Sequence, residues 1–266
     1  MTEVLLGIDT NERRARAQAE TTVDLFETDD LQAYLLHDFV DNPEGASVVQ
    51  VDAVHRAQEV LEAAGVAVSL REGSGDPVES IIEMAADLDV DAVCVAGRKR
   101  SPAGKMLFGS VSQSLVLESD RPVLLCSENY EPSVDGDTRD LLFGIDASED
   151  RAVLQAETVL DLFAPNRLRA HLLHDAGTSP NMPVSEVGAV DRAREILAAA
   201  DVPVAVRGGS GDPATSILDA AADVDADAIC VAGRKRSPAG KMLFGSVSQS
   251  VILNTERPVL LSSPSS

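Results

Sequence analysis

Residues 95–114 read VAGRKRSPAGKMLFGSVSQS, and the same letters return without a change at 231–250. Shorter matches lie on both sides of these segments: EVLLGID (3–9) with DLLFGID (140–146), AYLLHD (33–38) with AHLLHD (170–175), GSGDP at 73–77 and 209–213, and RPVLL at 121–125 and 257–261. Self-similarity at a nearly fixed period is the signature of repeated structural units. The chain of 266 residues is therefore predicted to hold two units of about 130 residues each.

The segment between the two copies has the composition of a linker. Residues 128–139, ENYEPSVDGDTR, contain Pro, Gly and charged residues without a regular apolar spacing. Such stretches connect folded units and contribute little to a core. We therefore expect a first domain at 1–127, a linker at 128–139 and a second domain at 140–263.

Each copy alternates short apolar runs with helical patterns. In the first copy we expect helices after Asp9, at 47–64, after Pro77 and from Gly109, and strands at 4–8, 31–37, 66–70, 91–97 and 122–126. In the second copy the apolar face predicted for the first helix consists of Val153, Ala156, Val159, Leu160 and Phe163. This alternation predicts an α/β fold made of two tandem five-stranded parallel doubly wound sheets of the Rossmann-like type. Ligands of such sheets bind beyond the carboxyl ends of the strands, where the strand order switches.

Composition excludes several classes of protein. With 44 acidic and 22 basic residues the formal charge is −22, and such a polyanion repels nucleic acids and anionic membranes. No apolar run reaches the length of a transmembrane helix, no signal peptide is visible, and the three cysteines form no pair motif. These features predict a cytoplasmic protein. Abundant acidic residues with only four lysines are typical of halophilic proteins, so we expect stability to fall at low ionic strength.

Basic residues are concentrated in the repeated segment. No acidic residue occurs from Gly97 to Leu117, and all four lysines of the chain lie in this loop and its copy. Glycines allow close backbone approach, a helix N-terminus favours negative charge, and Lys and Arg supply counter-charge. The alternative is that Ser110 only caps the helix while the basic residues pair with neighbouring carboxylates. The anion site predicted in each copy comprises Gly97, Arg98, Arg100, Gly104, Lys105, Gly109 and Ser110, and Gly233, Arg234, Arg236, Gly240, Lys241, Gly245 and Ser246.

Other polar residues are expected to have structural roles. Asp76 is predicted to be an N-cap, followed by proline at the first helical position. His37 and His174 end a strand and are expected to be buried and hydrogen-bonded, and Cys94 and Cys230 are expected to be core residues. No catalytic residue is predicted, because the chain has no Walker A motif, no Gly-x-Ser-x-Gly elbow and no metal-ligand spacing.

With these motifs the chain resembles the universal stress protein family over nearly its whole length. That family has a five-stranded parallel sheet of order 3-2-1-4-5, and its ATP-binding members carry a Gly-x2-Gly-x9-Gly-Ser/Thr loop after the fourth strand. Gly97 and Gly109-Ser110 match the first glycine and the last pair, and the second copy matches in the same way. Arg100 and Arg236 occupy the second glycine position, and the spacer that follows has eight residues in place of nine.

The resemblance also assigns acidic residues at strand ends. The family places an Asp after strand one near the adenosine and the metal, and Asp9 and Asp146 match it. The backbone after strand two contacts adenine in the family, and Asp38 and Asp175 fall there. The resemblance therefore implies ATP or AMP in each copy, with Mg²⁺ as an accompanying ion. From the residues alone, Asp9 and Asp146 could instead cap the helices that follow them.

Three functions follow as alternatives. The first is a tandem regulator that binds an adenine nucleotide in each copy and takes part in a stress response. The second is a slow ATP hydrolase or phosphotransferase, and the third is a nucleotide-free scaffold whose basic loops bind an anion or a partner carboxylate. The family commonly dimerises through strand five, so 122–126 and 258–262 are expected to pair antiparallel within one chain. Further oligomerisation is left open.

Overall fold

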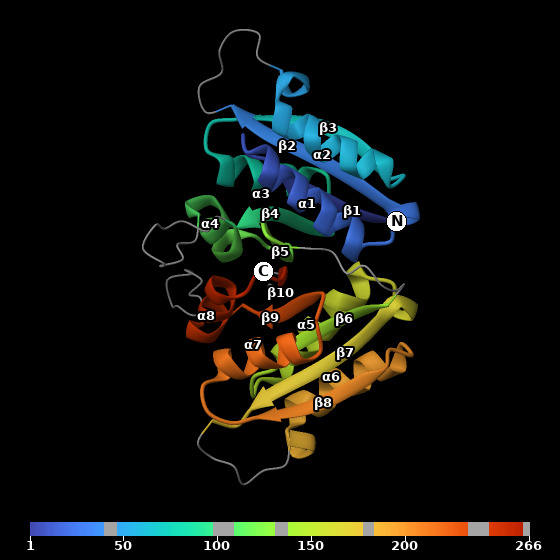
Figure 1. Cartoon of the computed structure of the whole chain (residues 1–266), viewed down its shortest axis with the longest axis vertical. Helices are drawn as coiled ribbons and strands as arrows, with labels where there is room; N and C mark the ends of the chain where they lie inside the picture. Colours follow the sequence, from blue (N-terminus) through green and yellow to red (C-terminus); the bar gives the residue numbers. More distant parts are fainter. Residues whose placement is uncertain (40–46, 98–108, 131–137, 178–183, 234–244, 263–266) are drawn as a thin grey trace. The chain divides into compact units, whose positions relative to one another are not determined.

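The protein is described by a computed structural model that covers residues 1–39, 47–97, 109–130, 138–177, 184–233 and 245–262. It contains two compact units, Met1–Pro132 and Ser133–Ser266. Figure 1 shows the first unit in blue to green and the second in yellow-green to red. Both units are α/β structures around a parallel sheet, so the predicted fold class is confirmed.

The two units have the same order of elements. The first consists of β1 (Thr2–Gly7), α1 (Glu12–Leu25), η1 (Thr28–Asp30), β2 (Leu31–Phe39), η2 (Val48–Gln50), α2 (Asp52–Ala63), β3 (Ala67–Ser74), α3 (Pro77–Asp87), β4 (Ala92–Gly97), α4 (Ser110–Glu118) and β5 (Val123–Ser127). The second consists of β6 (Arg139–Gly144), α5 (Glu149–Leu162), η3 (Pro165–Arg167), β7 (Leu168–Asp175), η4 (Val184–Glu186), α6 (Gly188–Ala199), β8 (Val204–Gly209), α7 (Pro213–Asp223), β9 (Ala228–Ala232), α8 (Ser246–Asn254) and β10 (Val259–Ser262).

Within each unit the strands lie in the order that the family resemblance implied. The first unit has the order β3-β2-β1-β4-β5 and the second has β8-β7-β6-β9-β10, and neighbouring strands within each unit are parallel. The direction in which the chain adds strands reverses between β1 and β4, and between β6 and β9. Parallel strands end at the same edge of the sheet, so this reversal leaves a crevice beyond the ends of β1 and β4.

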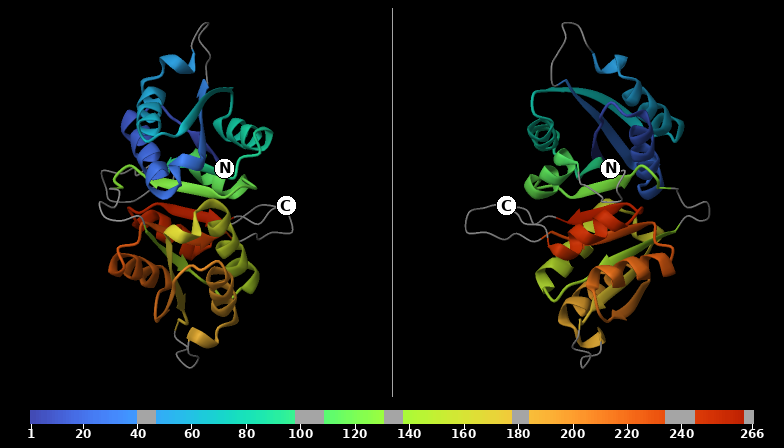
Figure 2. Two further views of the ribbon diagram at one scale, coloured as in Figure 1. Left: turned by 90° about the vertical axis from the view of Figure 1, so that its right-hand side faces the viewer. Right: turned by 60° about the vertical axis from the view of Figure 1, so that its left-hand side comes forward.

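Helices cover both faces of each sheet. In the first unit α1 packs with α2, and α3 packs with α4; in the second α5 packs with α6, and α7 packs with α8 (Figure 2). Central strands are therefore buried on both faces, which is why β1 reads as an unbroken apolar run. Val4, Leu5 and Leu6 have no exposed surface. None of the described helices is long and apolar enough to cross a membrane.

Three elements differ from the sequence expectation. The edge strand β3 continues to Ser74, four residues beyond the expected end, because its backbone pairs with β2 while its polar side chains stay partly exposed. The helix expected at 47–64 is divided into η2 and α2, and Ser47 with Gln50 forms a capping box around η2. In α5 the buried side includes Gln155, whereas Val153 and Leu160 are only half-buried.

Candidate functional site

Each unit has a cavity at its switch point. The cavity of the first unit measures about 540 Å³ and lies between the ends of β1, β2 and β4 and the first turns of α3 and α4. The second unit has a cavity of about 410 Å³ in the equivalent place. Both fall in the range of about 300–1,000 Å³ that is usual for small-molecule sites.

A glycine at the end of the first strand lines each cavity, Gly7 in one unit and Gly144 in the other. A Cβ on Gly7 would lie 2.8 Å from Ile81 Cδ1, and one on Gly144 would lie 2.7 Å from Ile217 Cδ1. Glycine therefore allows α3 and α7 to pack closely against β1 and β6. Gly97 is different, because a Cβ there would meet its nearest atom, the Cys126 carbonyl oxygen, at an ordinary 3.6 Å. Packing thus gives no reason for glycine at position 97.

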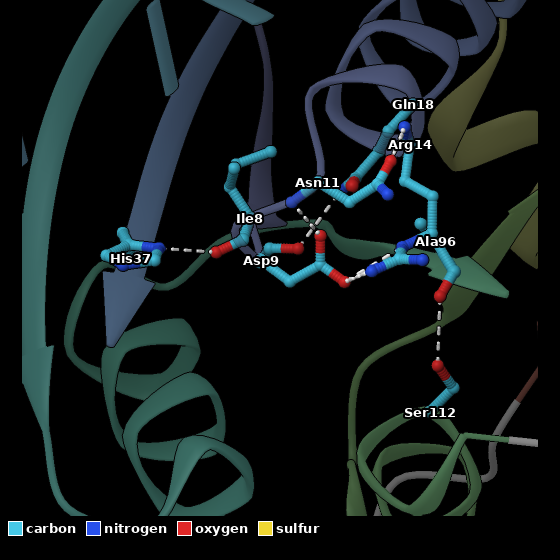
Figure 3. A network of polar contacts seen from close by, with 9 residues as sticks. Ile8, Asp9, Asn11, Arg14, Gln18, His37, Ala96 and Ser112 are labelled. Atoms are coloured by element: carbon cyan, nitrogen blue, oxygen red, sulfur yellow. Dashed lines mark hydrogen bonds and ion pairs between the residues drawn. The ribbon is translucent and has the colours of Figure 1, made fainter. Parts of the chain in front are cut away.

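The start of α4 closes one end of the first cavity. Gly109 is the N-cap and Ser110 is the first helical residue, so the alternative in which Ser110 caps the helix is wrong. Glycine has no side chain with which to cap, so no side chain of the N-cap residue bonds the first N–H groups of the helix. The Ser112 hydroxyl donates to the Ala96 carbonyl oxygen at 3.1 Å and ties α4 to the end of β4 (Figure 3). In the second unit α8 starts at Gly245 in the same way, and Ser248 bonds Ala232 at 3.4 Å.

Asp9 lies just beyond the end of β1, and both Asn11 and Arg14 bond its carboxylate. Its Oδ1 accepts from the Asn11 N–H at 2.9 Å, and its Oδ2 accepts from Arg14 Nε and Nη2 at 2.9 and 2.5 Å (Figure 3). The side chains of Asp9 and Arg14 are 30% and 18% exposed, so the pair is partly desolvated. The N-cap of α1 is Asn11, which means that Asp9 does not cap this helix.

The second unit repeats this arrangement with a different cap. Asp146 Oδ1 accepts from the Ser148 N–H at 2.9 Å, and Oδ2 accepts from Arg151 Nε and Nη2 at 2.8 and 2.6 Å. Ser148 is the N-cap of α5. Arg151 lines the cavity of its unit. The two arginines lie 137 positions apart, and this internal match is the signal that could have identified them from sequence.

Histidine at the end of the second strand is hydrogen-bonded in both units, as expected, but the expected burial holds for His37 and is wrong for His174, which is half-buried. His37 is buried, and its Nδ1 donates to the Ile8 carbonyl oxygen at 2.8 Å (Figure 3). His174 Nδ1 bonds the Ile145 carbonyl oxygen at 2.9 Å. Because a carbonyl oxygen only accepts, each Nδ1 carries the proton. Both rings line a cavity and fix the strand ends that form its wall.

Asp38 and Asp175 line their cavities but also anchor neighbouring elements. The Asp38 carboxylate lies over Gly73 and bonds the Ser80 hydroxyl, and burial raises its pKa. Its Oδ1 is buried and has no hydrogen-bond partner within the described part of the chain. Asp175 accepts from the Ser216 hydroxyl and, at 2.6 Å, from the Gly177 N–H. Asp38 therefore ties the end of β2 to α3, and Asp175 ties the end of β7 to α7.

A buried glutamine at the switch point was not predicted. Gln18 on α1 is 1% exposed, and its Nε2 donates to the carbonyl oxygens of Cys94 at 2.7 Å and Gly7 at 3.4 Å. Gln155 on α5 bonds Cys230 and Gly144 at 3.4 and 3.3 Å. The amide thus bridges the two strands between which the sheet order reverses. Apolar periodicity does not identify such a residue, although the same internal match would.

The remaining predicted residues have structural positions. Asp76 caps α3 by accepting from Val78 N–H at 2.8 Å, with Pro77 in the first turn, so that prediction is confirmed. Asp76 and Pro77 also line the cavity. Cys94 and Cys230 are buried core residues, as predicted, and burial raises the pKa of the Cys94 thiol to about 12.

All the arginines and lysines of the predicted anion site, and two of its glycines, lie outside the described residues. These are Arg98, Arg100, Lys105, Arg234, Arg236 and Lys241, with Gly104 and Gly240. The described members are Gly97 and Gly233 at the ends of β4 and β9, and the Gly-Ser pairs at the starts of α4 and α8. Within the described ranges, no three His, Cys, Asp or Glu side chains form a group that could hold a metal ion.

A doubly wound sheet with a cavity at its switch point and a glycine-capped helix beside it defines a Rossmann-like α/β domain, present here twice. The model of the universal stress protein family matches residues 1–127 and 137–262, and the chain belongs to that family. It has the tandem form of the family domain.

The individual relatives match shorter parts of the chain than the family model does. A universal stress protein of Mycolicibacterium smegmatis is 36% identical over 72 residues, and the stress response protein NhaX of Bacillus subtilis is 45% identical over 51 residues. These matches span 55% and 31% of the relatives, and 27% and 19% of this chain. The crystal structure of a universal stress protein from Archaeoglobus fulgidus covers 98% of both chains with a TM-score of 0.68 and 23% identity, which shows the shared fold.

Proposed function

We propose that each unit binds one adenine nucleotide, ATP or AMP, and that the protein is a stress-related regulator. The observation that carries this proposal is the cavity found at the switch point of both units, with the start of a glycine-capped helix at one end. The backbone N–H groups of such a helix start favour a phosphate group. The loop that precedes the helix contains all the lysines of the chain, which would add counter-charge.

The rest of the first cavity suits a nucleoside. Its walls include the apolar side chains of Ile8, Val78, Ile81 and Val95, which provide a surface for a flat base. Asp38, whose carboxylate forms another part of the cavity wall, lies on β2 and not on α4. A ligand with a phosphate at one end and hydrogen-bond donors at the other matches this arrangement, because a carboxylate accepts and a helix N-terminus donates.

Two described carboxylates that could act as a general base have structural partners. Asp9 is in an ion pair with Arg14, and Asp76 caps α3. General base catalysis requires a group placed to take a proton from the substrate or from water. These partners support a binding role over an ATP hydrolase.

Native mass spectrometry and calorimetry test the proposal on the full chain. We expect AMP or ATP to co-purify or to titrate with a stoichiometry of about two per chain at saturation. Titrations in low and high KCl are both needed, because surface charge is screened in the latter. Steady phosphate release from ATP would favour the hydrolase. No uptake of either nucleotide under any of these conditions would overturn the proposal and favour the anion or partner scaffold.

A further inference from the structure

We infer that these cavities bind the nucleotide without a divalent cation, because the carboxylates that line them in the described part of the chain are bonded by protein groups or have their remaining oxygen buried. The inference rests on the proposed function and concerns the form in which the nucleotide is bound. The family resemblance implied Mg²⁺ near Asp9 and Asp146, and the geometry of these two residues does not fit that role.

Mg²⁺ in nucleotide sites is usually bound through one or two carboxylates together with phosphate oxygens and water. Asp9 and Asp146 are the carboxylates nearest in sequence to the ends of β1 and β6. In each, one oxygen accepts a backbone N–H and the other accepts two bonds from a guanidinium. A cation bound to Oδ2 would be repelled by the guanidinium of Arg14 or Arg151, whose nitrogens lie 2.5–2.9 Å from the same oxygen.

The other described carboxylates of the first cavity offer no accessible unbonded oxygen. Asp38 bonds Ser80, and its Oδ1, which has no hydrogen-bond partner among the described residues, is buried over Gly73. Asp76 accepts from the N–H groups of Val78 and Glu79 at the start of α3. In the second cavity Asp175 accepts from the Gly177 N–H and the Ser216 hydroxyl. Each of these bonds would compete with coordination of a metal.

The sequence of the basic loops supplies no replacement carboxylate. Residues 98–108 and 234–244 contain no Asp, Glu, His or Cys. Each loop carries three arginines or lysines in succession and one more lysine. Cationic side chains can neutralise phosphate directly, which is the role that the metal ion has in many nucleotide sites.

The paired arginine also changes the net charge at the cavity wall. An aspartate alone would repel phosphate, whereas an aspartate paired with an arginine has a net charge close to zero. Arg151 lines the second cavity while its Nε and Nη2 bond Asp146, so its guanidinium is fixed in place. Fixed, partly desolvated ion pairs are costly to break, which disfavours exchange of the arginine for a metal.

Calorimetric titration of AMP and ATP into the full chain, at constant high KCl, separates the alternatives. One set of titrations contains excess EDTA and the other contains millimolar MgCl₂. For the wild type we expect AMP to bind with the same Kd within about twofold in both, and ATP to bind no more tightly in MgCl₂.

The double variant Arg14→Gln with Arg151→Gln removes both guanidinium groups and leaves the carboxylates. We expect Mg²⁺ to lower its Kd for ATP by about tenfold or more, since each carboxylate becomes available to the cation. The matched control is Arg56→Gln with Arg192→Gln. These residues form exposed ion pairs with Glu59 and Glu195, so the control has the same change in net charge and should gain no dependence on Mg²⁺.

Each outcome decides a separate point. Tighter ATP binding by about tenfold in MgCl₂ for the wild type would overturn the inference and leave the proposed function standing. The same gain in the control variant, or its absence in a folded Arg14→Gln, Arg151→Gln protein, would also overturn it. No binding of either nucleotide by the wild type, with or without Mg²⁺, would overturn the proposed function and the inference with it. Because the wild-type titrations are decisive alone, the test does not depend on the stability of the double variant.

Discussion

The two units are alike at the carboxyl ends of their strands and only partly alike at the amino ends, where Asp91 and Asp227 accept the equivalent backbone N–H but other side-chain pairs differ. At the carboxyl ends, the Asp9–Arg14 pair has its counterpart in Asp146–Arg151, with the same atoms in contact. At the amino ends, the Tyr34 hydroxyl bonds Glu3 at 3.1 Å in one unit. In the other, His171 Nε2 lies 2.6 Å from Asp140. The amino ends need only packing and satisfied polar groups, which several residue combinations provide. The carboxyl ends surround the cavity, where a ligand would restrict the choice.

Two differences at the carboxyl ends show where this similarity stops. Asp175 has a partner on each oxygen, whereas Asp38 Oδ1 is buried and has none among the described residues. The second cavity is also smaller, at about 410 Å³ against about 540 Å³. The two sites therefore share their helix start and ion pair, and differ in the wall that Asp38 and Asp175 form.

The largest effect is expected at the helix start. Gly109→Val would place a branched side chain beside the first N–H groups of α4, so it should abolish binding in the first unit, with a loss of at least about a hundredfold in affinity. Gly245→Val should do the same in the second unit only. Calorimetric stoichiometry should fall from about two to about one in each single variant. Two sites that both disappear in one variant would show that the units do not bind independently.

The loop lysines are expected to have the next largest effect. Lys105→Ala and Lys241→Ala should each weaken nucleotide binding by roughly ten- to a hundredfold, since a charge-assisted contact is lost. The loss should be smaller in high salt, where exposed charges are screened. Because the two loops are identical in sequence, the two variants should behave alike in titrations. A change in melting temperature without a change in affinity would assign these lysines to pairing with nearby carboxylates.

Salt should affect the units unequally. Residues 1–127 contain 23 acidic and 10 basic residues, a difference of −13, and residues 140–266 contain 17 and 11, a difference of −6. Repulsion within the folded state rises with net charge and is screened by salt. Lowering KCl from about 2 M to about 0.1 M should therefore lower the melting temperature. The amide hydrogens of the first unit should lose more of their protection against exchange than those of the second. Amide hydrogen exchange of the full chain measures each unit separately, and equal losses in both would contradict this.

The smallest effects are expected at Asp38 and Asp175, and they should have opposite signs. Burial raises the pKa of Asp38, so its contribution to stability falls as pH rises above the usual aspartate range. Asp38→Asn mimics the neutral form and should raise the melting temperature near pH 7, with the gain shrinking as pH falls toward about 4.

Asp175→Asn provides the comparison. An amide has one acceptor oxygen, so this variant should lose a bond to Gly177 or Ser216, at a cost of about 1–2 kcal/mol in unfolding free energy. Thermal melts from pH 8 to pH 4 measure both variants. Shifts of the same sign at neutral pH would contradict the assignment of one unsatisfied and one satisfied carboxylate.

Most of the fold was predictable because it depends on patterns along the chain. Apolar runs such as Val4–Ile8 mark strands buried on both faces, and the exact repeat of 95–114 shows that the pattern occurs twice. The ends of edge strands were less predictable. The strand β3 continues to Ser74 because hydrogen bonding to β2, and not burial of side chains, decides where an edge strand ends.

A tandem α/β fold and a glycine-rich, basic loop after the fourth strand could be predicted from the amino-acid sequence, because local periodicity and glycine placement are properties of neighbouring residues. The hydrogen-bond and ion-pair partners became known from the three-dimensional structure. Asp9 and Arg14 meet because a strand end and the first turn of a helix bring them together, and Gln18 meets Cys94 across 76 positions. The availability of a carboxylate for a metal depends on such contacts, since hydrogen bonds and charge pairing act over a few ångströms in space, at any separation along the chain.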